Sequence, residues 1–124
     1  MRYLIDTNSV IYLFTGKYPL LTARLSDQPA GDIGISTIVF AELIQGSTHG
    51  KPPLLPALEA VIAQMPLMPF DEPAARSYAR LPFRRGRYDR LLAAHALSLG
   101  ATVITANLAD FADVPGLQVE DWSR

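Results

Sequence analysis

Short β-prone runs alternate along this chain with longer segments of helical periodicity, and this alternation strongly constrains its fold. The predicted strands are brief, and the segments between them carry helix start and stop signals. Such alternation predicts βαβ units, in which the strands are parallel and helices cover the sheet. We therefore expect a three-layer α/β/α fold around a central sheet of short parallel strands. The predicted strands are residues 3–5, 33–35, 67–68, 102–105 and 117–119.

The segments between the strands are predicted as helices from their capping residues and apolar spacing. Asp71 and Glu72 before Pro73 form a strong helix start, because carboxylates stabilise the first helical turn and proline fits its first position. Gly100 is a typical residue at a helix end. We expect helices over residues 10–16, 19–29, 37–46, 54–65, 72–82 and 89–99, and a short helix after Asn107.

The length and composition favour one globular domain. The chain has 124 residues, of which 49% are hydrophobic, and a domain of this size buries roughly two-thirds of its unfolded surface. We therefore expect a single domain over residues 1–124. The absence of cysteine excludes disulfide scaffolds, thiolate metal sites and cysteine nucleophiles. No apolar segment has the length of a signal peptide or a membrane span, so a cytoplasmic protein is expected.

Four acidic residues lie where the predicted topology can bring them to one rim of the sheet. Asp6 ends the first strand, Asp110 follows the strand at 102–105, Glu42 is one turn into a helix, and Asp89 begins another. Ligands of parallel α/β sheets bind at the carboxyl ends of the strands. Clustered carboxylates repel one another unless a cation neutralises them, and oxygen ligands suit Mg²⁺ or Mn²⁺. The pattern predicts a metal site that positions a phosphodiester and activates water.

Each of these acids also has a purely structural interpretation. Asp6 and Asp89 are good helix caps, and Asp110 lies three residues after Asn107, which is the spacing of a capping box. Glu42 is harder to explain in this way, because its neighbours on the helix are largely apolar. An unpaired carboxylate is expensive to bury in such a stripe. The sequence therefore indicates a functional role for Glu42 more strongly than for the other three acids.

Several polar residues accompany the acids and have the same two interpretations. They either orient carboxylates, water and phosphate, or act as helix caps and turn residues. His95 lies six residues after Asp89 and on a different face of its helix, and His49 lies in a polar turn. Neither histidine has the spacing of a metal ligand, so no catalytic role is expected for them. The polar neighbours of the acids are Thr7, Asn8, Thr37, Thr105 and Asn107.

The segments around the acids resemble those of PIN-domain ribonucleases, and most closely the VapC toxins of prokaryotic type II toxin–antitoxin modules. The order and spacing of the segments carry the resemblance. The end of the chain, residues 114–122, also resembles the usual VapC ending, so the resemblance covers nearly the whole chain. The matching segments are residues 4–8 (Leu-Ile-Asp-Thr-Asn), 36–37, 41–46, 89–96 (Asp-Arg-Leu-Leu-Ala-Ala-His-Ala) and 105–111.

This resemblance implies the PIN fold and an Mg²⁺- or Mn²⁺-dependent endoribonuclease that cleaves RNA with a metal-activated water. It also implies a homodimer and a VapB-type antitoxin as partner. The stretch before Asp89 is shorter than in many relatives, so a more open groove is expected. The catalytic, metal-binding acids that the resemblance implies are Asp6, Glu42, Asp89 and Asp110. The residues implied to position carboxylates and water are Thr7, Asn8, Thr105 and Asn107.

The formal net charge of −1 conceals a basic segment. Residues 76–90 contain six arginines and one acid, a local charge of +5, so the other residues carry −6. Such a segment can follow RNA phosphates, and aromatic residues within it can stack on unpaired bases. The alternatives are a solvated helix face or a surface that matches an acidic antitoxin. The arginines expected to contact RNA are Arg84, Arg85, Arg87 and Arg90.

Two other functions agree with the same residues. One is a PIN nuclease of RNA maturation that acts without an antitoxin, and the other is a non-catalytic PIN-like RNA-binding module. The presence of all four acids favours an enzyme over a binding module. A generic phosphate-binding α/β protein is disfavoured, because no glycine-rich loop follows a predicted strand. We therefore expect a metal-dependent endoribonuclease toxin.

Overall fold

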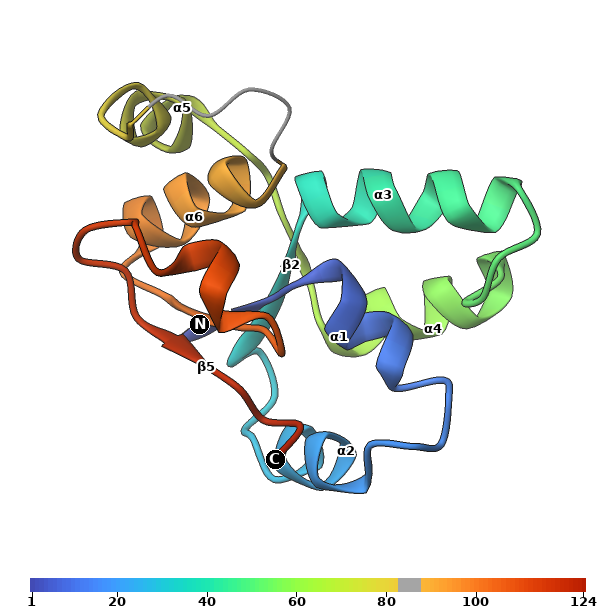
Figure 1. The fold of residues 1–124 in the computed structure, drawn as a ribbon. Coiled ribbons are helices and arrows are strands. Elements are labelled where there is room, and N and C mark those ends of the chain that lie inside the picture. Colours follow the sequence, from blue (N-terminus) through green and yellow to red (C-terminus); the bar gives the residue numbers. More distant parts are fainter. Residues whose placement is uncertain (83–87) are drawn as a thin grey trace.

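The computed structural model describes residues 1–82 and 88–124, which form a three-layer α/β/α fold. The strands are all parallel and lie in the order β3-β2-β1-β4-β5. Helices α5 and α6 lie on one side of the sheet, and α1 and α4 on the other (Figure 1). The predicted fold class is therefore confirmed. The strands are β1 (Tyr3–Ile5), β2 (Ile33–Ser36), β3 (Leu67–Met68), β4 (Thr102–Ile104) and β5 (Val119–Glu120).

The helices begin close to the predicted caps. The carboxylates of Asp6 and Asp71 each accept a hydrogen bond from a backbone N–H of the first turn, and the Ser36 hydroxyl does the same. Within the described ranges, no helix is long and apolar enough to cross a membrane. The helices are α1 (Thr7–Tyr12), α2 (Pro19–Ser26), α3 (Thr37–Thr48), α4 (Leu55–Gln64), α5 (Glu72–Ala79), α6 (Tyr88–Leu99) and the 3₁₀ helix η1 (Leu108–Phe111).

Several predicted boundaries were wrong by a few residues, and local hydrogen bonds explain two of them. The first helix ends at Tyr12, because residues 13–15 continue as a turn in which each N–H bonds to the carbonyl three residues earlier. The last strand begins at Val119 rather than Leu117, because the Leu117 N–H bonds back to the Val114 carbonyl in a turn. In both places, local hydrogen bonds change the geometry where the apolar pattern continues.

The central position of β1 determines where the first acid lies. Its residues pair with β2 on one side and with β4 on the other, and Ile5 is opposite Ile104. The N–H of Asp6 donates to the Ile104 carbonyl at 3.0 Å. Asp6 therefore lies in the middle of the carboxyl edge of the sheet, which is the edge where parallel α/β proteins bind ligands.

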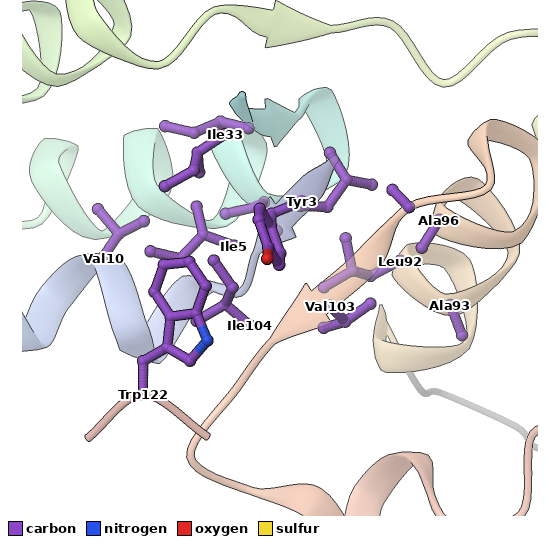
Figure 2. Close-up of a cluster of buried hydrophobic side chains, with 14 of the residues drawn as sticks. Tyr3, Ile5, Val10, Ile33, Leu92, Ala93, Ala96, Val103, Ile104 and Trp122 are labelled. Atoms are coloured by element: carbon purple, nitrogen blue, oxygen red, sulfur yellow. The ribbon is translucent and has the colours of Figure 1, made fainter. Parts of the chain in front are cut away.

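The core consists of apolar side chains from the central strands and the helices that cover them (Figure 2). Leu4, Ile5 and Ile104 are completely buried. Ala93 and Ala96 are also completely buried, and their small side chains allow α6 to lie close to the sheet.

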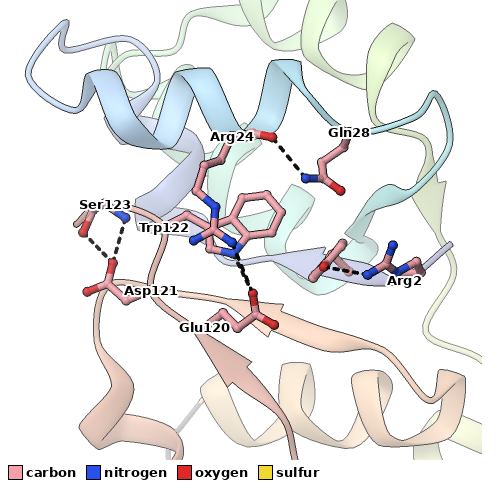
Figure 3. Close-up of polar contacts among 8 residues, drawn as sticks. Arg2, Arg24, Gln28, Glu120, Asp121, Trp122 and Ser123 are labelled. Carbon is pink, nitrogen blue, oxygen red and sulfur yellow. Dashed lines mark hydrogen bonds and ion pairs between the residues drawn. The ribbon is translucent and has the colours of Figure 1, made fainter.

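Trp122 anchors the end of the chain in this core (Figure 3). The indole is 1% exposed and packs edge-on against Tyr3, with 4.8 Å between the ring centroids. Its Nε1 donates to Glu120 Oε1 at 2.8 Å. The guanidinium of Arg24 lies 4.5 Å from the indole centroid and 3.7 Å from Glu120 Oε1. These contacts join α2, β1 and the C-terminal segment.

Replacing Arg24 by alanine should lower the free energy of unfolding by about 1 kcal/mol. The substitution removes a cation–π contact and a half-exposed ion pair, each of which contributes roughly 0.2–1 kcal/mol. Urea unfolding followed by far-UV circular dichroism measures the change. Arg76→Ala is the matched control, because its bond to Glu72 is largely exposed and contributes roughly 0.3–0.5 kcal/mol. Equal losses in the two variants would show that the Arg24 contacts add no particular stability.

Candidate active site

Asp6 has both a structural role and a place in a pocket. It is the N-cap of α1, with only 9% of the residue exposed, and its Oδ1 accepts a hydrogen bond from the Ser9 N–H at 2.8 Å. The helix-cap interpretation is therefore confirmed. The same residue lines a pocket at the carboxyl edge of the sheet. Capping fixes the orientation of this carboxylate at the pocket.

Glu42 is held by a residue from another helix. Thr7, the first residue of α1, donates its hydroxyl to Glu42 Oε1 at 2.7 Å. This bond supplies a polar partner for a half-buried carboxylate on α3, whose neighbours on the helix are largely apolar. It also joins α1 to α3 next to Asp6.

Three of the four predicted acids meet in one small pocket of about 90 Å³. Asp6 comes from the end of β1, Glu42 from α3 and Asp89 from the first turn of α6. Residues separated by more than 80 positions in the sequence thus share one rim, as the predicted topology required. The pocket is lined by Asp6, Thr7, Asn8, Glu42, Tyr88, Asp89 and Leu92.

The fourth acid, Asp110, lies on η1 and does not line this pocket. Its Oδ2 accepts a hydrogen bond from Asn107 Nδ2 at 2.6 Å, while the Asn107 N–H donates to the Thr105 hydroxyl at 3.0 Å. This arrangement differs from a capping box, in which the carboxylate accepts from the backbone N–H of the cap residue. Thr105 and Asn107 thus orient the segment that carries Asp110.

The chemistry of the donors fits a hard divalent cation. The small pocket is lined by carboxylate, hydroxyl and amide groups and has no histidine, and such oxygen donors suit Mg²⁺ or Mn²⁺. Within residues 1–82 and 88–124, however, no three carboxylate or imidazole groups are close enough together to hold one ion. Binding of a metal by three acids would therefore require their side chains to rotate.

The structure contradicts the RNA-contact role expected for Arg90. Its side chain is only 3% exposed, Nη1 lies 2.7 Å from Asp113 Oδ1, and Nη2 donates to the Pro82 carbonyl at 2.9 Å. These contacts make the guanidinium part of the packing around α6, where RNA phosphates cannot reach it. Arg84, Arg85 and Arg87 lie outside the described residues.

His95 is a buried residue that links the two helices carrying Glu42 and Asp89. The residue is 1% exposed, its Nδ1 lies 2.9 Å from the hydroxyl of Ser36, and its ring packs edge-on against Phe70. Ser36 caps α3, the helix that carries Glu42. His95 on α6 therefore connects the two helices that contribute Glu42 and Asp89. Burial lowers the pKa of His95, and the nearby Asp71 charge and Pro69 carbonyl oppose this shift.

The sequence did not predict the groove that continues from the acidic pocket. This groove has a volume of about 430 Å³ and shares Thr7, Glu42 and Tyr88 with the smaller pocket. It also contains Gln45 and His49. A signal was present in the sequence, because residues 42, 45, 46 and 49 follow the three-to-four spacing of one helix face.

Comparison with known proteins agrees with this fold. Residues 3–117 match the family model of the PIN domain. Ribonuclease VapC1 of Haemophilus influenzae is 31% identical over the full length of both chains. The tRNA(fMet)-specific endonuclease VapC of Salmonella typhimurium is 30% identical over 98% of both. The crystal structure of DNA-bound VapBC from Salmonella typhimurium superposes with a TM-score of 0.88, at 29% identity and 98% coverage of both chains.

A second solved complex has the same fold. The crystal structure of VapBC2 from Rickettsia felis, bound to a DNA fragment from the promoter, gives a TM-score of 0.84 at 26% identity, covering 98% of this chain and 99% of the other. The family match over residues 3–117 shows that this chain is a PIN-domain protein. The chain belongs to the VapC ribonucleases of that family, as its sequence resemblance implied.

The buried His95 should make the fold less stable in mild acid. Because its pKa is lowered in the folded protein, the unfolded chain takes up a proton first as the pH falls through about 6.5. We expect the free energy of unfolding to decrease between pH 7.5 and 5.5. Urea unfolding across this range should show a smaller decrease for His95→Gln.

The other histidine of the chain provides the control. His49 is exposed, so His49→Gln should keep the pH dependence of the unmodified protein. If His95→Gln keeps the full decrease as well, protonation of His95 does not contribute to acid destabilisation.

Proposed function

We propose that this chain is a divalent-metal-dependent endoribonuclease toxin in which Asp6, Glu42, Asp89 and Asp110 are the catalytic, metal-binding acids. Membership of the VapC ribonucleases provides the general activity and the toxin–antitoxin context. The assignment of the centre rests mainly on one observation, that three acids from three separate elements line one pocket at the carboxyl edge of the sheet.

The pocket needs a cation before it can accept RNA. Three carboxylates that line one pocket repel one another and would repel a phosphodiester. A divalent ion bound there would offset these charges, polarise the phosphate and acidify a coordinated water. The hard oxygen donors of the pocket support Mg²⁺ or Mn²⁺ as that ion.

The remaining polar residues would hold the acids in position. The Ser9 N–H donates a hydrogen bond to Oδ1 of Asp6, and the Thr7 hydroxyl donates one to Oε1 of Glu42. Each carboxylate is therefore oriented through one of its oxygens. Asn8 lines the same pocket, where its amide can donate to a phosphate oxygen. The contacts of Thr105 and Asn107 would place Asp110 at the edge of the centre.

The partners that we infer are RNA as substrate and a VapB-type antitoxin, together with a homodimer of this chain. The solved relatives titled VapBC support the antitoxin and favour a toxin over a nuclease of RNA maturation. A non-catalytic RNA-binding module is disfavoured, because binding alone does not require three acids in one pocket.

Asp6→Asn should reduce RNA cleavage by roughly a hundredfold or more, because a lost metal ligand removes several kcal/mol of transition-state stabilisation. The measurement is cleavage of a labelled RNA, with and without EDTA, followed by addition of Mg²⁺ or Mn²⁺. EDTA should abolish the activity and either metal should restore it. Asp27→Asn, at an exposed position after α2, is the control and should cut normally. Equal cleavage by the Asp6 variant and the unmodified protein would exclude the proposed centre.

Thr7→Val should raise the metal concentration needed for half-maximal activity by roughly 10- to 100-fold. Residues that orient metal ligands typically contribute this much to metal affinity or activity, and valine keeps the shape of threonine while losing the bond to Glu42. Thr7→Ser retains the hydroxyl and should restore metal activation. Titration of cleavage activity with Mg²⁺ distinguishes the variants. If valine changes neither the metal requirement nor the rate, the Thr7–Glu42 bond does not serve the reaction.

A further inference from the structure

The groove beside the acidic pocket follows one face of α3. Its lining includes Glu42, Gly46 and His49 on successive turns, together with Lys51, whose backbone N–H bonds back to the Gly46 carbonyl at 2.9 Å. Four residues of helix span about 6 Å, so Gly46 lies about one helical turn beyond Glu42, which lines the acidic pocket. Because the two cavities share Thr7, Glu42 and Tyr88, a chain whose phosphate lies at the acids can continue into the groove.

Gly46 keeps this groove open at a cost to the helix. Glycine inside a helix destabilises the helix by roughly 0.5–1 kcal/mol relative to alanine. Among residues 1–82 and 88–124, a Cβ at this position would meet only the Cβ of Lys51, at 3.7 Å, which is an ordinary contact. The packing of the described residues therefore does not require glycine. An occupant of the groove that lies against α3 would require it.

Two residues that line the groove, Tyr88 and Lys51, have complementary chemistry. Tyr88 is 60% exposed where the groove meets the acidic pocket, and its flat ring offers a surface on which a base can stack. Lys51 is exposed beside Gly46 and forms no ion pair within residues 1–82 and 88–124. An aromatic surface followed by a cation matches a base followed by a phosphate.

We infer that this groove is a subsite for single-stranded RNA. The nucleotide next to the cleaved bond lies over Gly46, its base stacks on Tyr88, and the next phosphate contacts Lys51. The inference rests on the proposed function, which places the cleaved phosphate at the acidic pocket. The volume of about 430 Å³ lies within the range of small-ligand sites, ~300–1,000 Å³. An RNA strand uses both the stacking surface and the cation, and it continues directly from the acids.

Binding can be tested independently of cleavage in the Asp6→Asn protein. The probe is a short fluorescein-labelled single-stranded RNA, and its affinity is measured by fluorescence anisotropy with Mg²⁺ present over a range of salt concentrations. Adding Lys51→Glu should weaken binding about tenfold and reduce the slope of log affinity against log salt by about 0.7, the effect of one lost phosphate contact on a single strand. Adding Tyr88→Ala should weaken binding at least about fivefold, since stacking contributes ~1–3 kcal/mol per base.

The chain offers a matched control, because Lys17 is its only other lysine. Lys17 is exposed and does not line the groove, so Lys17→Glu makes the same charge change elsewhere and should leave affinity and salt slope nearly unchanged. Gly46→Ala adds one methyl group to the wall of the groove. It should weaken RNA binding without lowering the melting temperature, which separates an effect on the groove from an effect on folding.

The inference is overturned if Lys51→Glu and Tyr88→Ala bind the RNA as tightly as the Asp6→Asn parent. It is also overturned if Lys17→Glu weakens binding as much as Lys51→Glu does. If the groove variants lose affinity only for a peptide from the C-terminus of a VapB-type antitoxin, the groove is a peptide site. Failure of the unmodified protein to cut RNA contradicts the proposed function instead, and that assay is separate from these affinities.

Discussion

The parallel pairing of β1 with both β2 and β4 determines where Asp6 and the acidic pocket lie. Only three residues of β1 are paired, and they are almost completely buried. The next residue, Asp6, is held by its backbone to Ile104 and by its carboxylate to the first turn of α1. Strand pairing, helix start and acidic pocket therefore meet at one residue. A shift in the β1 register would displace all three together.

The structural and functional interpretations of the acids are compatible. Asp6 caps a helix with one carboxylate oxygen and faces the pocket, and Glu42 is paired with Thr7 at the same rim. A carboxylate that also caps a helix is oriented before any ligand binds. The hydrogen bonds from Ser9 and Thr7 stabilise negative charge that would otherwise destabilise a cluster of acids. The fold thus offsets part of the electrostatic cost of the site through its secondary structure.

The sequence predicted the architecture well because its signals are local. Caps such as Asp71 and Ser36 and the stop at Gly100 act within one or two helical turns. The convergence of Asp6, Glu42 and Asp89 could be predicted because parallel strands end at one edge of the sheet, whereas the strand order itself was visible only in the structure. Burial depends on distant partners, so the sequence could not show that Arg90 bonds to Asp113 and Pro82. The groove along α3 was missed for the same reason, because its second wall belongs to α1 and α6.

The anchoring of Trp122 has a practical consequence for observing this protein. It is the only tryptophan in the chain, and it lies buried against Tyr3 with Arg24 over one face. Excitation at the red edge of indole absorption therefore reports on a single, known environment. An emission shift toward longer wavelength would signal that the C-terminal segment has separated from β1 and α2. The fluorescence of Trp122 thus reports, without a label, on the packing of the C-terminal segment against β1 and α2.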